Sequence, residues 1–332
     1  MKTLLINPPY PFVEVPIMPM GLLYLAGVLE HNRKEVQILD LLVTKYSKEK
    51  IKSKIEDYKP DIVGVTCVTM NYPAASDILK YRKSLDKNII TIVGGPHVTF
   101  ATTETLTESP WIDIVVRGEG ELTMLDIVSG KELARIDGIA YRDKADGIRL
   151  TGERSLIENL DELPRPARHL FPLSRYHALG TACGVITSRG CPFSCIFWGG
   201  SKMGGRRMRY RNPNLVLDEI EEGLALGFKE VDLEDDLLTV NHKHLYAICD
   251  GIIERGLKFK WCAFSRVDTV NMEVLRKMKQ AGCVRVYFGI ESGNAEMLKR
   301  IRKGITLEQA VSAVQACRQT GMSAFASFMV GL

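Results

Sequence analysis

The strongest constraint on this chain of 332 residues is its repeated alternation of short apolar runs with longer amphipathic segments. Continuous apolar runs separated by helical patterns are typical of parallel strands that are covered by helices on both faces. The expected strands are Thr3–Asn7, Val36–Asp40, Asp61–Thr66, Ile89–Gly94 and Ile112–Arg117, with helices over Gly21–His31, Ser47–Tyr58 and Ala74–Asp86. We therefore predict an α/β fold whose N-terminal domain is a doubly wound parallel sheet.

The alternation resumes after a segment rich in proline and charge, Leu160–Pro172, which we interpret as part of a linker. Just before it, Asp137–Arg142 and Gly147–Thr151 are separated by a polar turn and predict a β-hairpin. The later elements are expected at Gly184–Ser188, Pro213–Leu226, Glu230–Glu234, Lys243–Arg255, Lys260–Phe264, Glu273–Ala281, Arg285–Ile290, Leu307–Thr320 and Ser323–Val330. Strands and helices in this order predict a partial (β/α) barrel with its site at the carboxyl ends of the strands.

Three regions follow from this organisation. We predict a first domain with its hairpin over residues 1–150, a linker over 151–180 and the partial barrel over 181–332. The sequence ends where a fifth barrel strand ends, and such a strand would have an unpaired edge. We interpret this end as a truncation.

Composition limits the class of protein. Hydrophobic residues make up 45% of the chain and charged residues 25%, with a net charge of only +4 and no basic stripe, so we expect no nucleic-acid partner. The eight cysteines mostly lie inside apolar runs rather than at the spacings of a disulfide scaffold. No apolar run approaches the length of a membrane span. We therefore expect reduced thiols, a cytoplasmic location and no membrane span.

Glycine, proline and polar residues follow the first, third, fourth and fifth expected strands. The loops are Asn7–Pro11, Thr66–Thr69, Gly94–His97 and Gly118–Glu121. Because ligands of open parallel sheets bind at the carboxyl ends of the strands, four such loops on one edge favour a ligand site. Gly94 and Gly95 would let the backbone approach a bulky ligand, or they would only close a tight turn, and both interpretations stay open.

The stretch Val185–Gly200, VITSRGCPFSCIFWGG, joins an apolar strand to a short loop with two cysteines. Cys191 and Cys195 are four residues apart, so the loop can bring both thiols to one metal centre. Trp198 follows three residues later. A tryptophan cannot serve as a metal ligand because its indole N–H group is a donor only.

The first half resembles the cobalamin-binding domain that precedes many radical S-adenosylmethionine (SAM) enzymes, which carry N-P-P, G-G-P-H and G-E-G-E in the same loops. The resemblance covers most of residues 1–130 and implies a cobalamin site. It would be formed by Pro9, Thr66, Gly94, Gly95, His97, Gly118 and Glu119. The D-x-H-x-x-G sequence that supplies a histidine to cobalt in other cobalamin folds is absent. His97 would then position the loop or contact the corrin, and a purely structural role stays open.

The second half resembles the radical SAM core, which carries C-x-x-x-C-x-x-C at the position of Cys191 and Cys195. In that family three thiolates hold a [4Fe-4S] cluster and leave one iron open for SAM. Here Trp198 occupies the third cysteine's position. The resemblance assigns Cys191 and Cys195 to the cluster, and Cys183 is the one other cysteine that we retain as a substitute ligand.

Three loops of the second half provide groups that suit SAM. They are Asp232–Asp236, Phe264–Asp268 and Gly289–Gly293. An amine, a carboxylate and a ribose require acceptors, a guanidinium and hydroxyl partners that converge from different strands. The resemblance implies SAM contacts for Phe197, Asp235, Arg266, Glu291 and Ser292.

The family reaction is reductive cleavage of SAM followed by hydrogen abstraction from a substrate, with cobalamin commonly carrying a methyl group to it. The implied partners are a small-molecule or peptide substrate and an external electron donor. No residue is assigned as catalytic. The alternative, favoured by Trp198 and by the end of the chain, is a non-catalytic protein that binds cobalamin or SAM, or an inactive fragment.

Overall fold

The computed structural model describes residues 1–11, 16–143 and 147–331 and has two compact units. The first comprises Met1–Ile157 and Leu163–Gly180, and the second comprises Glu158–Glu162 and the chain from Thr181 onward. The chain therefore passes between the units after residues 157, 162 and 180. The domain limits expected from the sequence stay a prediction, although much of the expected linker makes its contacts inside the first unit.

The first unit contains one sheet with the strand order β2-β1-β3-β4-β5-β6-β7 in the described residues. Neighbouring strands from β2 to β5 are parallel, and β6 and β7 are added in antiparallel fashion. The strands are β1 (Thr3–Asn7), β2 (Val36–Asp40), β3 (Ile62–Thr66), β4 (Ile90–Gly94), β5 (Ile114–Val116), β6 (Ile139–Arg142) and β7 (Ile148–Leu150). The predicted parallel sheet and the hairpin strands are confirmed, whereas residues 144–146 of the expected turn lie outside the described residues.

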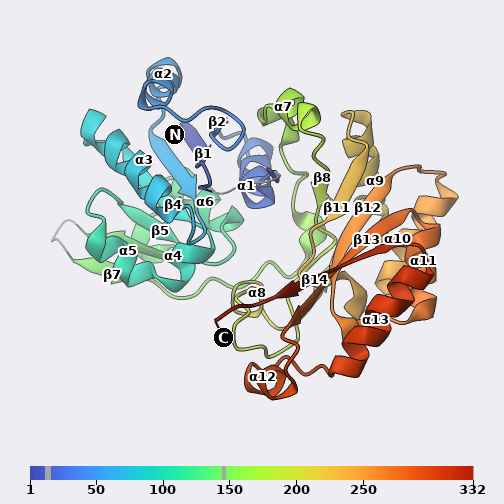
Figure 1. The fold of residues 1–332 in the computed structure, drawn as a ribbon. Helices are drawn as coiled ribbons and strands as arrows, with labels where there is room; N and C mark the ends of the chain where they lie inside the picture. Colours follow the sequence, from blue (N-terminus) through green and yellow to red (C-terminus); the bar gives the residue numbers. More distant parts are fainter. Residues whose placement is uncertain (12–15, 144–146, 332) are drawn as a thin grey trace. The chain divides into compact units, whose positions relative to one another are not determined.

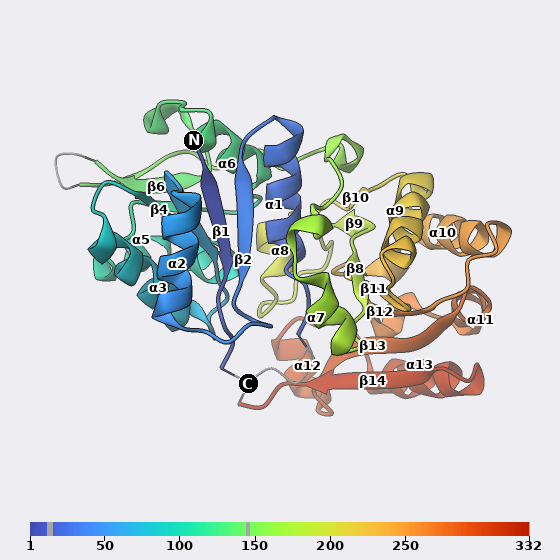
Figure 2. The same cartoon turned by 90° about the horizontal axis from the view of Figure 1, so that it is seen from above.

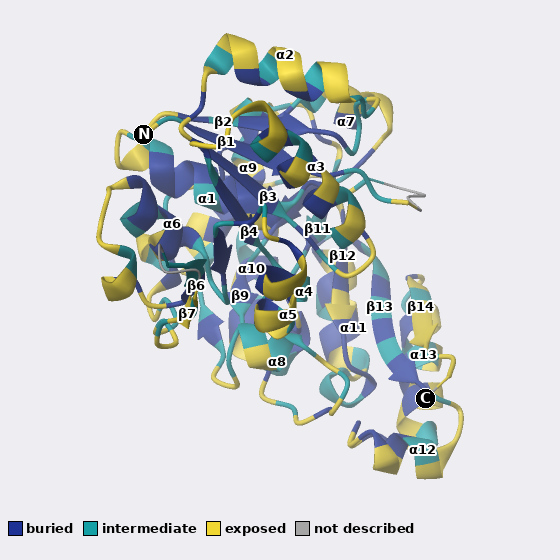
Figure 3. Cartoon of the chain, turned by 90° about the vertical axis from the view of Figure 1, so that its left-hand side faces the viewer, coloured by how far each residue is buried: buried dark blue, intermediate teal, exposed yellow. Residues whose placement is uncertain are grey.

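Helices cover both faces of this sheet (Figure 1). They are α1 (Met20–His31), α2 (Lys48–Tyr58), α3 (Tyr72–Leu85), α4 (Pro96–Phe100), α5 (Thr102–Glu108) and α6 (Glu121–Val128). Leu4 and Ile6 of β1 point to the face where α2, α3 and α5 contribute to one buried cluster, and Leu5 between them points to the opposite face. The strands are buried on both faces, which explains their uninterrupted apolar sequences (Figure 3).

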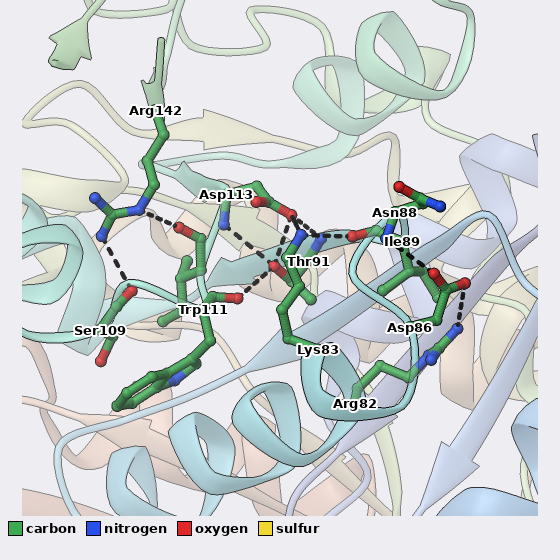
Figure 4. Close-up of polar contacts among 11 residues, drawn as sticks. Arg82, Lys83, Asp86, Asn88, Ile89, Thr91, Ser109, Trp111, Asp113 and Arg142 are labelled. Atoms are coloured by element: carbon green, nitrogen blue, oxygen red, sulfur yellow. Dashed lines mark hydrogen bonds and ion pairs between the residues drawn. The ribbon is translucent and has the colours of Figure 1, made fainter. Parts of the chain in front are cut away.

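Polar side chains close the amino edge of this sheet (Figure 4). The carboxylate of Asp113 accepts hydrogen bonds from Lys83 Nζ at 2.6 Å and from Thr91 N at 2.8 Å. Arg142 donates to the carbonyl oxygens of Ile112 at 3.0 Å and Ser109 at 3.1 Å. These bonds fix the starts of β4 and β5, while the opposite, carboxyl edge carries the glycine-rich loops.

The second unit contains a parallel sheet with the order β14-β13-β12-β11-β8 in the described residues. The strands are β8 (Cys183–Val185), β11 (Glu230–Leu233), β12 (Lys260–Ser265), β13 (Cys283–Glu291) and β14 (Ser323–Phe328). The longer helices between them are α9 (Pro213–Ala225), α10 (His242–Glu254), α11 (Met272–Gln280) and α13 (Leu307–Gln319), and they lie on one side of the sheet (Figure 1). This succession confirms the predicted partial (β/α) barrel, and Figure 2 shows β13 and β14 side by side.

Side-chain caps mark several of the predicted helix starts. Ser47 Oγ accepts from Lys50 N at the start of α2, and Asn271 Oδ1 accepts from Val274 N at the start of α11. Thr306 and Gln309 form a reciprocal capping box at α13. These residues satisfy backbone donors that have no partner inside the helix, so the helix starts where they stand.

The sequence did not predict several short elements. These are α4, α5 and α6 of the first unit, α7 (Leu173–Ala178), α8 (Gly200–Met203), α12 (Ala295–Arg300) and the two-residue strands β9 (Ser188–Arg189) and β10 (Arg209–Tyr210). Segments of this length complete too few turns or alternations to leave a periodic pattern. In the described part of the chain, no helix is long and apolar enough to cross a membrane.

Candidate cofactor sites at two sheet edges

The turn between β4 and α4 requires glycine at position 95. Gly95 has φ +104° and ψ 178°, a conformation that is essentially restricted to glycine. A Cβ atom there would lie 2.5 Å from the carbonyl oxygen of Cys67. A Cβ atom at Gly94 would meet nothing closer than Val116 at 3.7 Å. The geometry thus supports the tight-turn interpretation for Gly95, and Gly94 is free of this constraint.

The imidazole ring of His97 is held from two sides within the first unit. Its centroid lies 4.3 Å from that of Tyr72, and Nδ1 is 3.2 Å from Thr69 Oγ1. Burial lowers the pKa of His97 from its ordinary value of 6.5, which favours the neutral ring. These contacts suit the positioning role considered for His97, whereas its contact with a corrin stays a prediction.

The loop after β5 combines an anchored residue with an open one. Glu119 Oε2 accepts a hydrogen bond of 2.8 Å from the backbone of Ile157, so Glu119 ties this loop to a later segment of the same unit. Gly118 has φ +67°, and a Cβ atom there would meet no heavy atom within 4 Å. Space for a ligand therefore lies over Gly118, while Glu119 is committed to a structural contact.

Large apolar side chains are exposed on the same edge of the first sheet. Ile17, Met70 and Phe100 are 57%, 54% and 52% exposed, and they follow β1, β3 and β4 along the chain. Pro9 and Thr66, also expected at the cobalamin site, are half-buried there. An edge that offers open space and apolar side chains fits a large, flat macrocycle such as a corrin.

A buried polar network at the ends of β1 and β2 was missed in the sequence. Asn7 Nδ2 donates to Asp40 Oδ1 at 2.9 Å, and the Tyr176 hydroxyl donates to Asp40 Oδ2 at 2.7 Å. All three residues are at most 3% exposed, and burial together with the charge of Asp40 raises the pKa of Tyr176. The available signal was that Asn7 and Asp40 end adjacent strands in register. Tyr176 was 136 residues further along and gave no signal.

The loop with the two cysteines is tightly packed in the second unit. Cys191 and Cys195 are 6% and 8% exposed, and both are free thiols. Gly190 has φ +104°, and a Cβ atom there would lie 2.6 Å from the carbonyl oxygen of Arg207. Burial raises the pKa of Cys191, an effect that a nearby metal cation would oppose.

The donor set of this loop does not fit a cluster that requires three protein thiolates. Within the described ranges, no group of three or more His, Cys, Asp or Glu side chains is placed to hold a metal ion. Trp198 is 41% exposed, and its Nε1 lies 2.5 Å from the position that a Cβ atom of Gly200 would take. Cys183 is fully buried, and its sulfur lies 2.8 Å from the corresponding position of Gly223 in α9. Cys183 therefore faces a helix and cannot replace the missing thiolate in this fold.

Arg266 follows β12 and already has partners within its own unit. Its Nε and Nη2 atoms donate to the carboxylate of Asp268 at 2.9 and 2.8 Å, and Nη2 also donates to the carbonyl oxygen of Lys303 at 2.7 Å. Nη1 lies 3.5 Å from Cys195 Sγ, and the guanidinium lies 3.6 Å from the Phe193 ring centroid. Arg266 thus contacts the cysteine loop directly, and its predicted pairing with a SAM carboxylate would compete with these contacts.

Glu291 at the end of β13 forms a buried ion pair that the sequence did not predict. Its Oε1 atom lies 2.9 Å from Lys303 Nζ, and both residues are less than 10% exposed. A Cβ atom at Gly289 would lie 2.5 Å from Glu291 Oε1 and 2.9 Å from Lys303 Nζ, so the glycine makes room for the pair. Glu291 also has φ +72°, an unusual conformation of the kind that clusters at ligand sites. Lys303 lies 5.6 Å from the Phe197 ring, which brings two predicted SAM residues together.

A pocket of about 470 Å³ adjoins this strand end. Its lining includes Ser292, Asn294, Met297, Arg300 and Met329. Together with Glu296 these residues provide a hydroxyl, an amide, a cation, a carboxylate and two soft apolar side chains. Ser292 is the predicted SAM residue that borders an open volume.

Asp235 after β11 is buried and bound to the end of another strand of the barrel. Its carboxylate accepts hydrogen bonds of 2.6 Å from Thr187 N, Thr187 Oγ1 and Ser188 Oγ. Burial raises the pKa of Asp235, and these bonds oppose the rise. Although the neighbouring Asp236 is classed as exposed, the loss of water around its carboxyl group and the charge of Asp235 raise its pKa to about 6. Asp235 thus holds two strand ends together, and its contact with SAM stays a prediction.

The basic run Arg206–Arg211 also has local partners. Arg211 Nη1 lies 2.7 Å from Glu219 Oε2 in a buried ion pair, and Arg209 Nη2 donates to the carbonyl oxygen of Gly204 at 2.8 Å. Arg207 lies 3.0 Å from Glu158 on the surface. These contacts fasten the segment after the cysteine loop and leave only its exposed members available to other partners.

Family models match both halves of the chain. A B12-binding domain model matches residues 13–128, and a radical SAM superfamily model matches residues 185–332. An uncharacterized methyltransferase of Pyrococcus horikoshii is 39% identical over all of this chain and 74% of its own length. The anaerobic magnesium-protoporphyrin IX monomethyl ester cyclase of Rubrivivax gelatinosus is 32% identical, again over the whole chain. The chain belongs to the radical SAM proteins that carry a B12-binding domain.

Solved structures share the fold. The cobalamin-dependent SAM radical enzyme OxsB, solved with aqua-cobalamin and SAM bound, matches 99% of this chain with a TM-score of 0.86 at 22% identity. The radical SAM methyltransferase TsrM of Kitasatospora setae, solved with cobalamin and a [4Fe-4S] cluster, matches with a TM-score of 0.85 at 20% identity. The chain spans 63% of the cyclase and 49% of the OxsB chain.

Proposed function

We propose that this chain binds cobalamin at the carboxyl edge of the first sheet and SAM at the carboxyl edge of the second, and that it serves methyl transfer. The observation that carries the proposal is the open apolar edge around Gly118, Met70 and Phe100, inside the segment that the B12-binding model matches. Cobalamin supplies organometallic group-transfer chemistry when it is bound.

The chain's own residues would position the two ligands. Gly118 leaves room for the macrocycle, His97 presents a neutral ring fixed by Tyr72 and Thr69, and Ser292 borders the pocket beside Glu291. The methyl acceptor would be a small molecule or a peptide. The predicted external electron donor depends on an iron–sulfur cluster that the donor set does not fit.

The test is binding of hydroxocobalamin by the full chain, followed by gel filtration and by visible absorption of the protein peak. Met70 precedes α3 on the proposed site's edge, and Leu85 ends the same helix, which places it toward the opposite edge. We expect Met70→Glu to weaken cobalamin binding at least tenfold because a charge would have to be desolvated against the corrin. Leu85→Glu, at a residue of similar exposure, should bind like the wild type.

Circular dichroism of both variants checks that each is folded. A colourless protein peak for the wild type would remove the cobalamin proposal. Equal loss of binding in both variants would show that the edge around Met70 is not the site.

A second candidate is favoured by one observation, the presence of Trp198 where a third thiolate is needed. In that case the chain binds cobalamin, and SAM without cleaving it. The same binding experiment, followed by chromatographic analysis of SAM for cleavage products under reducing conditions, separates the two candidates.

A further inference from the structure

We propose that Trp198 excludes a [4Fe-4S] cluster from the second unit, so that Cys191 and Cys195 remain two free thiols and do not hold a cluster. Three irons of such a cluster need protein ligands when the fourth is left open, and this loop offers two thiols. An indole N–H group donates but does not coordinate, so Trp198 supplies no ligand.

The fold is adapted to the indole. Trp198 Nε1 and Cε2 lie 2.5 and 2.8 Å from the position of a Cβ atom at Gly200, so any larger residue at position 200 would collide with the ring. Asp236 Oδ1 lies 3.1 Å from the same position. The indole of Trp198 therefore lies against Gly200 of α8 and close to the loop after β11, although 41% of the residue is exposed.

Other cysteines of the second unit are directed elsewhere. Cys183 packs against α9, as described above, and Cys262 lies in β12 in register with Asp232 of β11 and Arg285 of β13. Cys262 is therefore inside the strand rather than at its carboxyl end, where the cysteine loop lies. Asp236 is a carboxylate candidate, because its Oδ1 atom and the indole both lie close to Gly200. With Cys191 and Cys195 it does not form a metal-binding group in the described structure.

The thiol of Cys195 has a partner within the protein. Arg266 Nη1 lies 3.5 Å from Cys195 Sγ, and the same guanidinium is fixed by Asp268 and by the carbonyl oxygen of Lys303. A guanidinium fixed in this way gives the buried sulfur of Cys195 a hydrogen-bond donor. Arg266 thus acts as a positioning residue for Cys195.

The experiment is anaerobic incubation of the full-length chain with excess ferrous iron and sulfide, followed by desalting. Iron and acid-labile sulfide per chain are then measured together with the visible absorption spectrum. The variants are Trp198→Cys, which restores a thiol, and Trp198→Ser, which removes the same bulk without a thiolate. We expect close to four irons per chain for Trp198→Cys, and far below one cluster per chain for the wild type and Trp198→Ser.

A wild type that retains four irons and four sulfides, and loses them in Cys191→Ser, would overturn the proposal. Asp236→Asn would then show whether that carboxylate is the third ligand. A folded Trp198→Cys protein without a cluster would also contradict it, because Trp198 would not be the cause. If Trp198→Cys fails to fold, the wild type and Trp198→Ser still decide. A cluster in the wild type refutes the proposal, and a cluster in neither protein supports it. A cluster in Trp198→Ser alone also supports exclusion by Trp198 and assigns it to the bulk of the indole. Cobalamin binding, measured on the same samples, tests the proposed function separately.

Discussion

The carboxyl edges of the two sheets differ in how much of their surface is already occupied by the protein's own contacts. In the first unit, the residues that follow β3, β4 and β5 include glycines and half-buried side chains, and there is open space over Gly118. In the second unit the corresponding positions carry charged residues that are buried and already paired, such as Glu291 with Lys303 and Arg266 with Asp268. An open edge can accept a ligand without rearrangement, whereas a paired edge must exchange one of its own contacts for each ligand contact.

The largest loss of stability should come from removing one partner of the Glu291–Lys303 ion pair at the edge of the second sheet. Lys303→Met leaves the carboxylate of Glu291 buried without its cation, and removal of one partner from a buried ion pair costs about 3–5 kcal/mol. The free energy of unfolding, from urea denaturation followed by circular dichroism, measures this loss. Lys299→Met, an exposed lysine in α12, is the control and should change stability little. Equal stability of the two variants would show that the edge does not depend on the pair.

A smaller loss should follow a change at the open edge. Gly95→Ala introduces a Cβ atom 2.5 Å from the carbonyl oxygen of Cys67 at φ +104°, and such backbone strain costs about 1–3 kcal/mol. Gly94→Ala adds the same atom to the neighbouring residue, where the nearest contact is an ordinary 3.7 Å, and should leave the melting temperature almost unchanged. If both variants melt like the wild type, the glycine at position 95 serves a ligand rather than the turn.

The network of Asn7, Asp40 and Tyr176 belongs to the edge of the first sheet, but its polar groups are buried and paired as they are at the edge of the second sheet. Tyr176→Phe removes the hydroxyl that donates to Asp40, and the loss of this bond should cost about 1–2 kcal/mol. Tyr246→Phe removes a hydroxyl that donates to Glu273 at an exposed site and should cost a few tenths of a kcal/mol. Denaturation midpoints of the two variants give the comparison, and a larger loss for Tyr246→Phe would contradict it.

The smallest effect concerns acidity at the second edge. The pKa of Asp236 is raised from 3.8 to about 6, so between these values the folded chain holds a proton that the unfolded chain has released. The free energy of unfolding should therefore fall as pH rises through this window. Because Asp236 is exposed, water screens its charge, and the change in the free energy of unfolding should be roughly 1 kcal/mol or less. Asp236→Asn should lack this decline. The free energy of unfolding of the wild type minus that of the variant should therefore fall between pH 4 and pH 6. A constant difference would refute the shift.

The sequence predicted the two sheets because their elements are long and regular. Burial on both faces leaves an uninterrupted apolar run, as in β1 and β4, and caps such as Ser47 mark the starts of helices. It also brought the loop residues of each sheet to one edge, since parallel strands end together. That prediction needs no knowledge of individual side chains.

The partners of the site residues could not be predicted in the same way. Lys303 lies after α12, a helix too short to be recognised, and Tyr176 lies in a segment expected to be a linker. Both contacts join residues that are not in neighbouring strands, so neither spacing nor periodicity reveals them. The structure therefore adds a partner within the same unit for each of Glu291, Arg266 and Asp235, and their SAM contacts stay a prediction.

The path of the chain between the units bears on how such proteins can be recombined. Because the chain changes unit after residues 157, 162 and 180, a single splice point does not separate the two sets of contacts. A hybrid joined at residue 150 would take Tyr176 from one parent and Asp40 from the other, and it would keep their bond only if both parents carry that pair. Hybrids joined after residue 180 keep the first unit whole, and they supply residues 158–162 of the second unit from the first parent. When the parents differ at Asp40 or Tyr176, an exchange of B12-binding domains at the later junction should therefore give the more stable hybrid.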